Sequence, residues 1–61
     1  MSPVEWFLLT QLLMQQGPIC IAREDRRFLN EMINLMTLDE DYDPLPWQRR
    51  WLLTLKRECR L

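Results

Sequence analysis

The stretch Trp47–Leu61, WQRRWLLTLKRECRL, decides the fold because its two faces differ in chemistry. Placed on a helix at 100° per residue, its apolar residues gather on one side and its basic residues on the other. The apolar side consists of Trp47, Trp51, Leu52, Leu55 and Cys59. The basic side consists of Arg49, Arg50, Lys56, Arg57 and Arg60. We therefore expect one side to pack against a core and the other to face water or an anionic partner.

The net charge of −1 hides an uneven distribution along the 61 residues. Residues 1–46 carry eight acidic and three basic residues, whereas residues 47–61 carry five basic residues and one acidic residue. Clustered basic charge of this kind can neutralise phosphates or meet an acidic protein surface. The residues that we predict for a nucleic-acid or acidic-partner contact are Arg49, Arg50, Lys56, Arg57 and Arg60.

Residues 3–16 are predicted to form the first helix. Ser2 and Glu5 have the spacing of a capping box, and Pro3 suits the first helical position, where its missing N–H costs nothing. Gly17 followed by Pro18 predicts the end of the helix, with Gly17 in the left-handed conformation.

This first helix is apolar on nearly every side, and Glu5 is its only charge. Its three apolar sides are Val4, Leu8 and Leu12; Trp6, Leu9 and Leu13; and Phe7 and Met14. Two further helices cannot cover all three sides, and surplus apolar surface typically marks a protein contact. The alternative is an aromatic residue that stays half exposed, as in many monomers. The residues that we predict to bind a partner are Trp6, Phe7, Leu13 and Met14.

The second helix is predicted at residues 22–36 and the third at 45–59, with Pro44 as an alternative first residue of the third. In the second, Arg27 stands at ion-pair spacing from Glu24 and Glu31. The acidic loop before the third helix ends at Asp43, which we expect to cap that helix with Pro44 at its first position. Beside one or two sides of the first helix, the predicted core contains Phe28, Leu29, Met32, Ile33, Met36, Trp47, Trp51 and Leu55.

The fold class predicted from these patterns is all-α, a single three-helix domain of 61 residues. A chain of this length buries little surface, so its stability should be marginal. The surplus apolar side of the first helix predicts a homodimer or a complex with another protein.

The residue inventory excludes several kinds of chemistry. The sequence has no His and a single Gly, which excludes imidazole catalysis, His-based metal sites and a glycine-rich phosphate loop. The run Asp39, Asp41, Asp43 has the spacing of a calcium loop, but Pro44 replaces the required Gly and Arg50 the required Glu. We therefore predict no enzymatic activity, no cofactor, no metal site and no small-molecule substrate.

The two cysteines, Cys20 and Cys59, and the start of the chain bear on location. No signal peptide precedes the first helix, and the apolar run from Val4 to Met14 is too short to span a bilayer. A cytoplasmic location is therefore predicted, with no membrane contact. There we expect two buried thiols packing as small hydrophobic groups, and one disulfide bridge is the alternative.

The C-terminal quarter of the chain, PLPWQRRWLLTLKRE, resembles the tails of small helical proteins encoded by bacteriophages and integrative elements. The matching residues are Pro46, Gln48, Trp51, Leu52 and Arg57. The resemblance implies a mobile-element accessory protein that regulates by binding another protein or DNA, and it carries no active-site residues with it.

The predicted function is therefore that of a small non-enzymatic regulator acting by protein–protein interaction through an apolar helix surface. The alternative is a dimeric DNA-binding regulator that uses the basic face of the C-terminal helix. Two features count against that alternative: the acidic connection of about eight to ten residues before the helix is too long for a helix-turn-helix, and the sequence pI is near 5.2.

Overall fold

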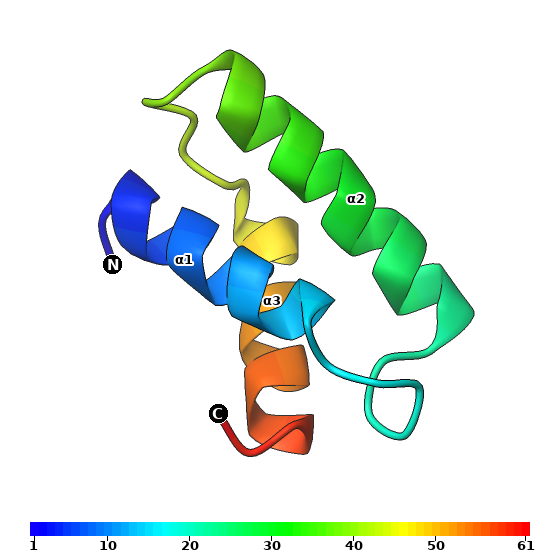
Figure 1. The fold of residues 1–61 in the computed structure, drawn as a ribbon. Coiled ribbons are helices and arrows are strands. Elements are labelled where there is room, and N and C mark those ends of the chain that lie inside the picture. Colours follow the sequence, from blue (N-terminus) through cyan, green and yellow to red (C-terminus); the bar gives the residue numbers. More distant parts are fainter.

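The computed structural model describes residues 1–61 as three helices, α1 (Pro3–Met14), α2 (Arg23–Leu38) and α3 (Pro46–Glu58). In Figure 1, α1 crosses α3 while the longer α2 lies alongside, and α1 packs against both of the others. The prediction of an all-α three-helix domain is confirmed. No helix combines the length and apolar character that a bilayer crossing needs.

The start of α1 confirms the predicted capping box. The backbone N–H of Ser2 donates to Glu5 Oε1 at 3.2 Å, and the N–H of Glu5 donates to Ser2 Oγ at 3.3 Å. Pro3 occupies the first turn, as expected. Two reciprocal hydrogen bonds therefore satisfy N–H groups that the helix itself leaves unpaired.

The end of α1 differs from the prediction. The helix stops at Met14 rather than at residue 16, and Gly17 does not adopt the left-handed conformation. The carbonyl groups at this end find other donors, because Arg26 donates from Nη1 to the Met14 oxygen at 3.1 Å and from Nη2 to the Gln16 oxygen at 2.6 Å. A left-handed glycine cap is therefore not needed here.

The start of α3 also differs from the prediction. The helix begins at Pro46, and Leu45 before it is extended, with φ −67° and ψ 157°. A residue that precedes proline is sterically disfavoured in the helical conformation, which explains the late start. Asp43 therefore does not cap the helix, and its carboxylate instead forms an ion pair with Arg49 at 2.8 Å.

The core is formed by all three helices and one linker residue. Its buried apolar side chains are Trp6, Leu9, Leu13, Ile21, Phe28, Leu29, Met32, Met36, Leu52 and Leu55. The core prediction is confirmed for Phe28, Leu29, Met32, Met36 and Leu55. It is wrong for Trp47, which is 49% exposed, while Ile33 and Trp51 are only partly buried.

A buried glutamine explains why Trp47 is left outside. Gln48 Oε1 accepts hydrogen bonds from the Tyr42 hydroxyl and from the Leu45 N–H, both at 2.8 Å. With this oxygen satisfied, Gln48 can be buried beside Leu52 at little cost. The buried side of α3 is therefore rotated toward Gln48, and Trp47 moves to the edge.

The α2 and α3 helices meet through aromatic side chains rather than through close backbone approach. The Phe28 ring stacks on Trp51, with ring centroids 4.1 Å apart and planes 4° apart. The Trp51 Nε1–H donates to Asp25 Oδ1 at 2.9 Å. These contacts set the orientation of the Trp51 ring at the α2–α3 boundary.

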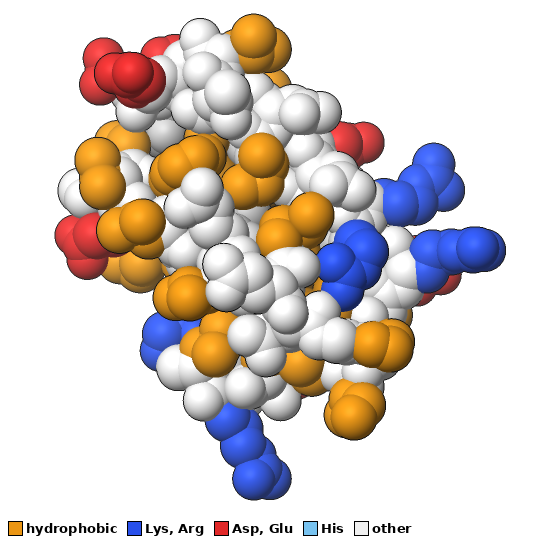
Figure 2. Space-filling view, viewed as in Figure 1, with side chains coloured by type: hydrophobic (Ala, Val, Ile, Leu, Met, Phe, Trp, Pro, Cys, Tyr) orange, Lys and Arg blue, Asp and Glu red, His pale blue; other side chains and the backbone are white.

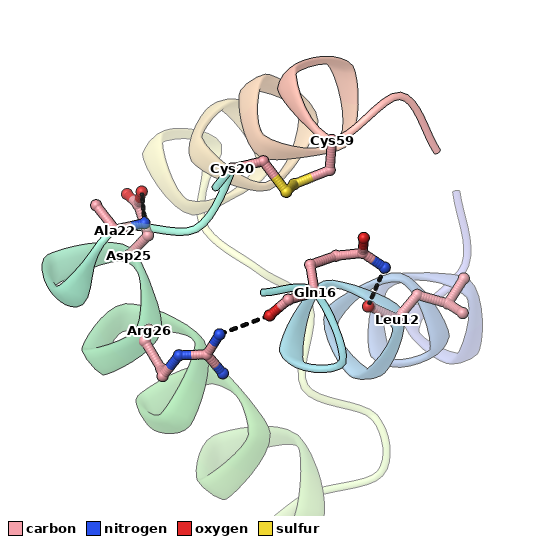
Figure 3. The surroundings of a disulfide bond; sticks show 7 residues. All are labelled: Leu12, Gln16, Cys20, Ala22, Asp25, Arg26 and Cys59. Atoms are coloured by element: carbon pink, nitrogen blue, oxygen red, sulfur yellow. Dashed lines mark hydrogen bonds between the residues drawn. A yellow bond between two sulfur atoms is a disulfide. The ribbon is translucent and has the colours of Figure 1, made fainter. Parts of the chain in front are cut away.

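A disulfide joins Cys20 in the α1–α2 linker to Cys59 at the end of α3 (Figure 3). The expectation of two separate thiols is therefore wrong, and the alternative of one bridge is found. The linker runs back past the end of α3 and brings the two Cα atoms to 5.4 Å, within the usual range for a disulfide. Disulfides persist mainly in oxidising compartments, so the bridge weakens the argument for a cytoplasmic location, which stays a prediction.

Candidate interaction surfaces

One side of α1 is exposed and apolar. Val4, Leu8 and Leu12 are 63%, 51% and 48% exposed, and their spacing of four places them in one line along the helix. We call this line the α1 stripe. The exposed side chains beside it include the uncharged Gln11 and Gln15. Large aliphatic side chains in a line are typical of a surface that binds another apolar surface.

The α1 stripe is not the side of α1 that was predicted to bind a partner. Trp6 is 4% exposed and Leu13 is 0% exposed, so both belong to the core and are inaccessible to a partner. Phe7 and Met14 are partly buried and pack against that core, and their contact with a partner stays a prediction.

A signal in the sequence could have identified the exposed side. Gln11, Gln15 and Glu5, three of the polar residues at this end of the chain, project around the α1 stripe, because residues three and four apart share a helix face. Thr10 obscured the pattern, since it is polar but completely buried. The Thr10 hydroxyl donates to the Trp6 carbonyl at 2.8 Å, so the buried hydroxyl has a hydrogen-bond partner within its own helix.

A groove runs beside the α1 stripe, between the start of α1 and the end of α2. It has a volume of about 310 Å³. Its lining residues are Pro3, Val4, Phe7, Met36, Thr37 and Glu40. Val4 belongs to both the stripe and the groove, so the two form one continuous apolar region. Phe7 is thus the one predicted partner-binding residue that borders this region.

The basic side of α3 is largely free of acidic partners. Arg49 is paired with Asp43, whereas the remaining four predicted cations are exposed and make no ion pair. These four are Arg50, Lys56, Arg57 and Arg60. Leu53, which is 46% exposed, is part of the same surface. In Figure 2, Lys or Arg side chains project at the lower edge, where the end of α3 lies in Figure 1, whereas those at the right edge lie over the start of α2.

A third surface is a cleft of about 270 Å³ between α2 and α3. We call it the aromatic cleft, and its lining residues are Glu24, Arg27, Phe28, Glu31, Trp47 and Trp51. The Trp47 ring lies 6.0 Å from Phe28 and 6.5 Å from Trp51 between centroids, and it is tilted by 50° to each. The Trp47 indole therefore forms one wall beside the stacked pair.

One further depression lies beside the disulfide. The largest depression, about 680 Å³, lies beside the disulfide and is wide open, with Ile19 fully exposed at its edge. No three His, Cys, Asp or Glu side chains lie close enough together to hold a metal ion. The pKa of Glu5 is lowered, first because its carboxylate accepts the Ser2 N–H and then because of its contact with the Ser2 hydroxyl, so this shift belongs to the capping box.

Comparison of the chain with protein-family models, with curated proteins and with solved structures found no match.

Proposed function

We propose that the protein is a small non-enzymatic regulator that acts by protein–protein contact through the α1 stripe. The observation that carries the proposal is the alignment of three large exposed aliphatic side chains, Val4, Leu8 and Leu12, on one helix. Helices that dock into apolar grooves use anchors at this kind of spacing. The neighbouring Gln11 and Gln15 are uncharged, so Glu5 at the start of the helix is the one ionised side chain near this side.

A second copy of the chain is the partner that this surface fits best. Two α1 helices related by a two-fold axis would bring identical apolar lines together without opposing like charges along them. Glu5 lies near the start of α1, so an antiparallel arrangement separates the two copies of this carboxylate.

The expected dimer is weak. Six half-exposed aliphatic side chains, three from each copy, contribute about 5 to 9 kcal/mol when buried, and the cost of association offsets part of that gain. We therefore expect dimerisation at roughly millimolar concentrations, with the adjoining groove adding affinity if Phe7 is covered as well.

Sedimentation equilibrium over a range of concentrations tests the proposal. The wild-type mass should rise with concentration, and Leu8→Gln with Leu12→Gln should remain monomeric. Leu53→Gln is the matched control, because Leu53 is exposed to a similar degree but lies on α3. A wild-type chain that stays monomeric at millimolar concentration, or a Leu53→Gln variant that loses the dimer equally, would contradict self-association through α1.

The second candidate function is binding of DNA by the basic side of α3. It is favoured by the four exposed cations that have no acidic partner, of which Arg50 and Arg57 lie on the same face at a spacing of seven. Duplex DNA should then bind at low salt, weaken as salt rises, and weaken further in Arg50→Ala with Arg57→Ala. Arg23→Ala, an exposed arginine on α2, is the control. Absence of binding at low salt would exclude this function.

A mobile-element origin and a cytoplasmic location stay predictions.

A further inference from the structure

The aromatic cleft has walls that are held in place before any ligand arrives. Phe28 is buried, and its ring is stacked against Trp51. The Trp51 indole is held by Asp25, whose other carboxylate oxygen accepts the Ala22 N–H at 3.1 Å (Figure 3). A ligand that contacts Trp51 therefore does not have to immobilise the ring, which lowers the cost of binding.

Trp47 gains little from the fold itself. About half of its surface remains in water, although an indole is among the side chains that gain most from burial. The Trp47 ring lies beside Trp51, with ring centroids 6.5 Å apart. Partly exposed tryptophans at a cleft are typical of positions that dominate the energy of a protein interface.

The charges around the cleft favour a cation. Glu24 and Glu31 line it from α2 and make no hydrogen bond or ion pair, although both stand at helical spacing from Arg27. The predicted ion pairs of Arg27 with these residues are thus not formed. Asp25 adds a negative charge at the Trp51 indole, which favours positive charge near that ring. Arg27 is the one cation of the lining and reduces this attraction.

We propose that the aromatic cleft binds a cationic side chain, the ammonium of lysine or the guanidinium of arginine, from a partner protein. Cations are attracted to the faces of tryptophan rings, and carboxylates at the edge of the site add a direct charge interaction. The volume of about 270 Å³ suits one side chain. Because the cleft is open, it cannot enclose most of a free ligand as small-molecule sites do, so the rest of the occupant must be held by other contacts.

This site lies between α2 and α3 and is independent of the α1 stripe. The test uses the disulfide-bonded full chain and a blocked ten-residue peptide that alternates lysine with glycine and serine. Binding is followed by NMR of the three indole N–H groups. We expect the peptide to shift the signals of Trp47 and Trp51, while buried Trp6 serves as an internal reference.

Four variants sharpen the test. Trp47→Leu should weaken peptide binding about tenfold, and Glu31→Gln should weaken it about two- to fivefold. Arg27→Gln should strengthen it by a similar factor, because it removes the competing positive charge. Glu40→Gln makes the same charge change as Glu31→Gln but lies in the α2–α3 loop, outside the cleft lining, so it should have no effect. Glu31 is exposed, so Glu31→Gln leaves the fold intact. If the Trp47→Leu variant unfolds, the comparison of Glu31→Gln with Glu40→Gln still tests the proposal.

Four results would overturn the proposal. They are an unchanged spectrum with the lysine peptide, equal binding of a peptide with glutamate in place of lysine, equal weakening by Glu31→Gln and Glu40→Gln, and binding of tetramethylammonium as tight as that of the peptide. The last result would identify the cleft as a site for small free cations instead of a protein side chain.

Discussion

The α1 and α3 helices have similar lengths, and each buries one side, yet they leave different chemistry outside. The 12 residues of α1 expose the aliphatic α1 stripe, whereas the 13 residues of α3 expose cations. A helix with apolar residues on nearly every side, such as α1, can bury more than one of them, so its neighbours influence which side enters the core. In α3, the charged residues must stay in water, so only the opposite face can be buried. The hydrogen bonds of Gln48 then rotate the buried face toward this residue.

The largest effect is expected from truncating neighbouring leucines on the buried and the exposed side of α1. Leu13→Ala should lower the free energy of unfolding by about 4 kcal/mol, because it opens a cavity at a completely buried position. Leu12→Ala should lower it by less than about 0.5 kcal/mol. Urea denaturation followed by circular dichroism measures both. Equal losses would mean that α1 buries a different side in solution.

The disulfide is a covalent link between the linker that follows α1 and the end of α3. Its two cysteines are 39 residues apart in the sequence. Cys20→Ser with Cys59→Ser should lower the free energy of unfolding by about 3 kcal/mol, since it removes a constraint on the unfolded chain. Unfolding with and without a thiol reductant measures the effect. The reductant should lower the wild-type stability and leave the serine variant unchanged; a wild-type chain insensitive to reductant would contradict the bridge.

Gln48 tests whether a polar residue truly orients α3. Gln48→Ala removes the acceptor of two hydrogen bonds and should cost about 1 to 2 kcal/mol. Gln11→Ala makes the same substitution at an exposed position of α1 and should change the free energy of unfolding by less than about 0.5 kcal/mol. The pair can be compared by thermal unfolding. If Gln48→Ala proves as mild as Gln11→Ala, these bonds do not hold the helix.

The smallest expected difference concerns the first turns of α1 and α3. Glu5 and Gln48 each accept a backbone N–H three residues earlier, but only Glu5 can titrate. Folding lowers the pKa of Glu5 below its ordinary value of 4.5. Its contribution to stability is therefore present above that value and is lost as the pH falls through the lowered pKa.

Thermal unfolding between about pH 3 and 7 measures this effect. In Glu5→Gln, the loss of stability below the ordinary pKa should be shallower than in the wild-type chain. Glu40→Gln, at an exposed loop position where the side chain makes no hydrogen bond, is the control. Identical pH profiles for wild type and Glu5→Gln would show that the capping box does not contribute.

Local signals predicted the helices well, and tertiary contacts account for most errors. Ser2, Pro3 and Glu5 act within one turn, so the start of α1 was predictable. The extended conformation of Leu45 could also have been predicted, since Pro46 follows it. The reach of Arg26 to the Met14 carbonyl was not predictable, because it depends on how α2 lies against the end of α1.

Of the three candidate surfaces, one was predicted from the sequence and two were not. The basic side of α3 was predicted from periodicity, because clustered charges on a helix stay in water wherever the helix packs. The predicted partner-binding residues of α1 do not include the α1 stripe, because the buried Thr10 obscured the polar signal of Gln11 and Gln15 beside that stripe. The aromatic cleft was not predicted at all. It requires Trp47 and Phe28 from different helices to lie 6.0 Å apart.

The number of helices, the capping box at the start of α1 and the charged side of α3 follow from the sequence, because they depend on interactions within a few residues of the chain. The replacement of Trp47 by Gln48 in the core and the meeting of Cys20 with Cys59 became clear only in the folded structure. These outcomes depend on close packing between segments far apart in sequence. In such packing, many apolar arrangements satisfy the hydrophobic pattern, but far fewer also pair each buried polar atom.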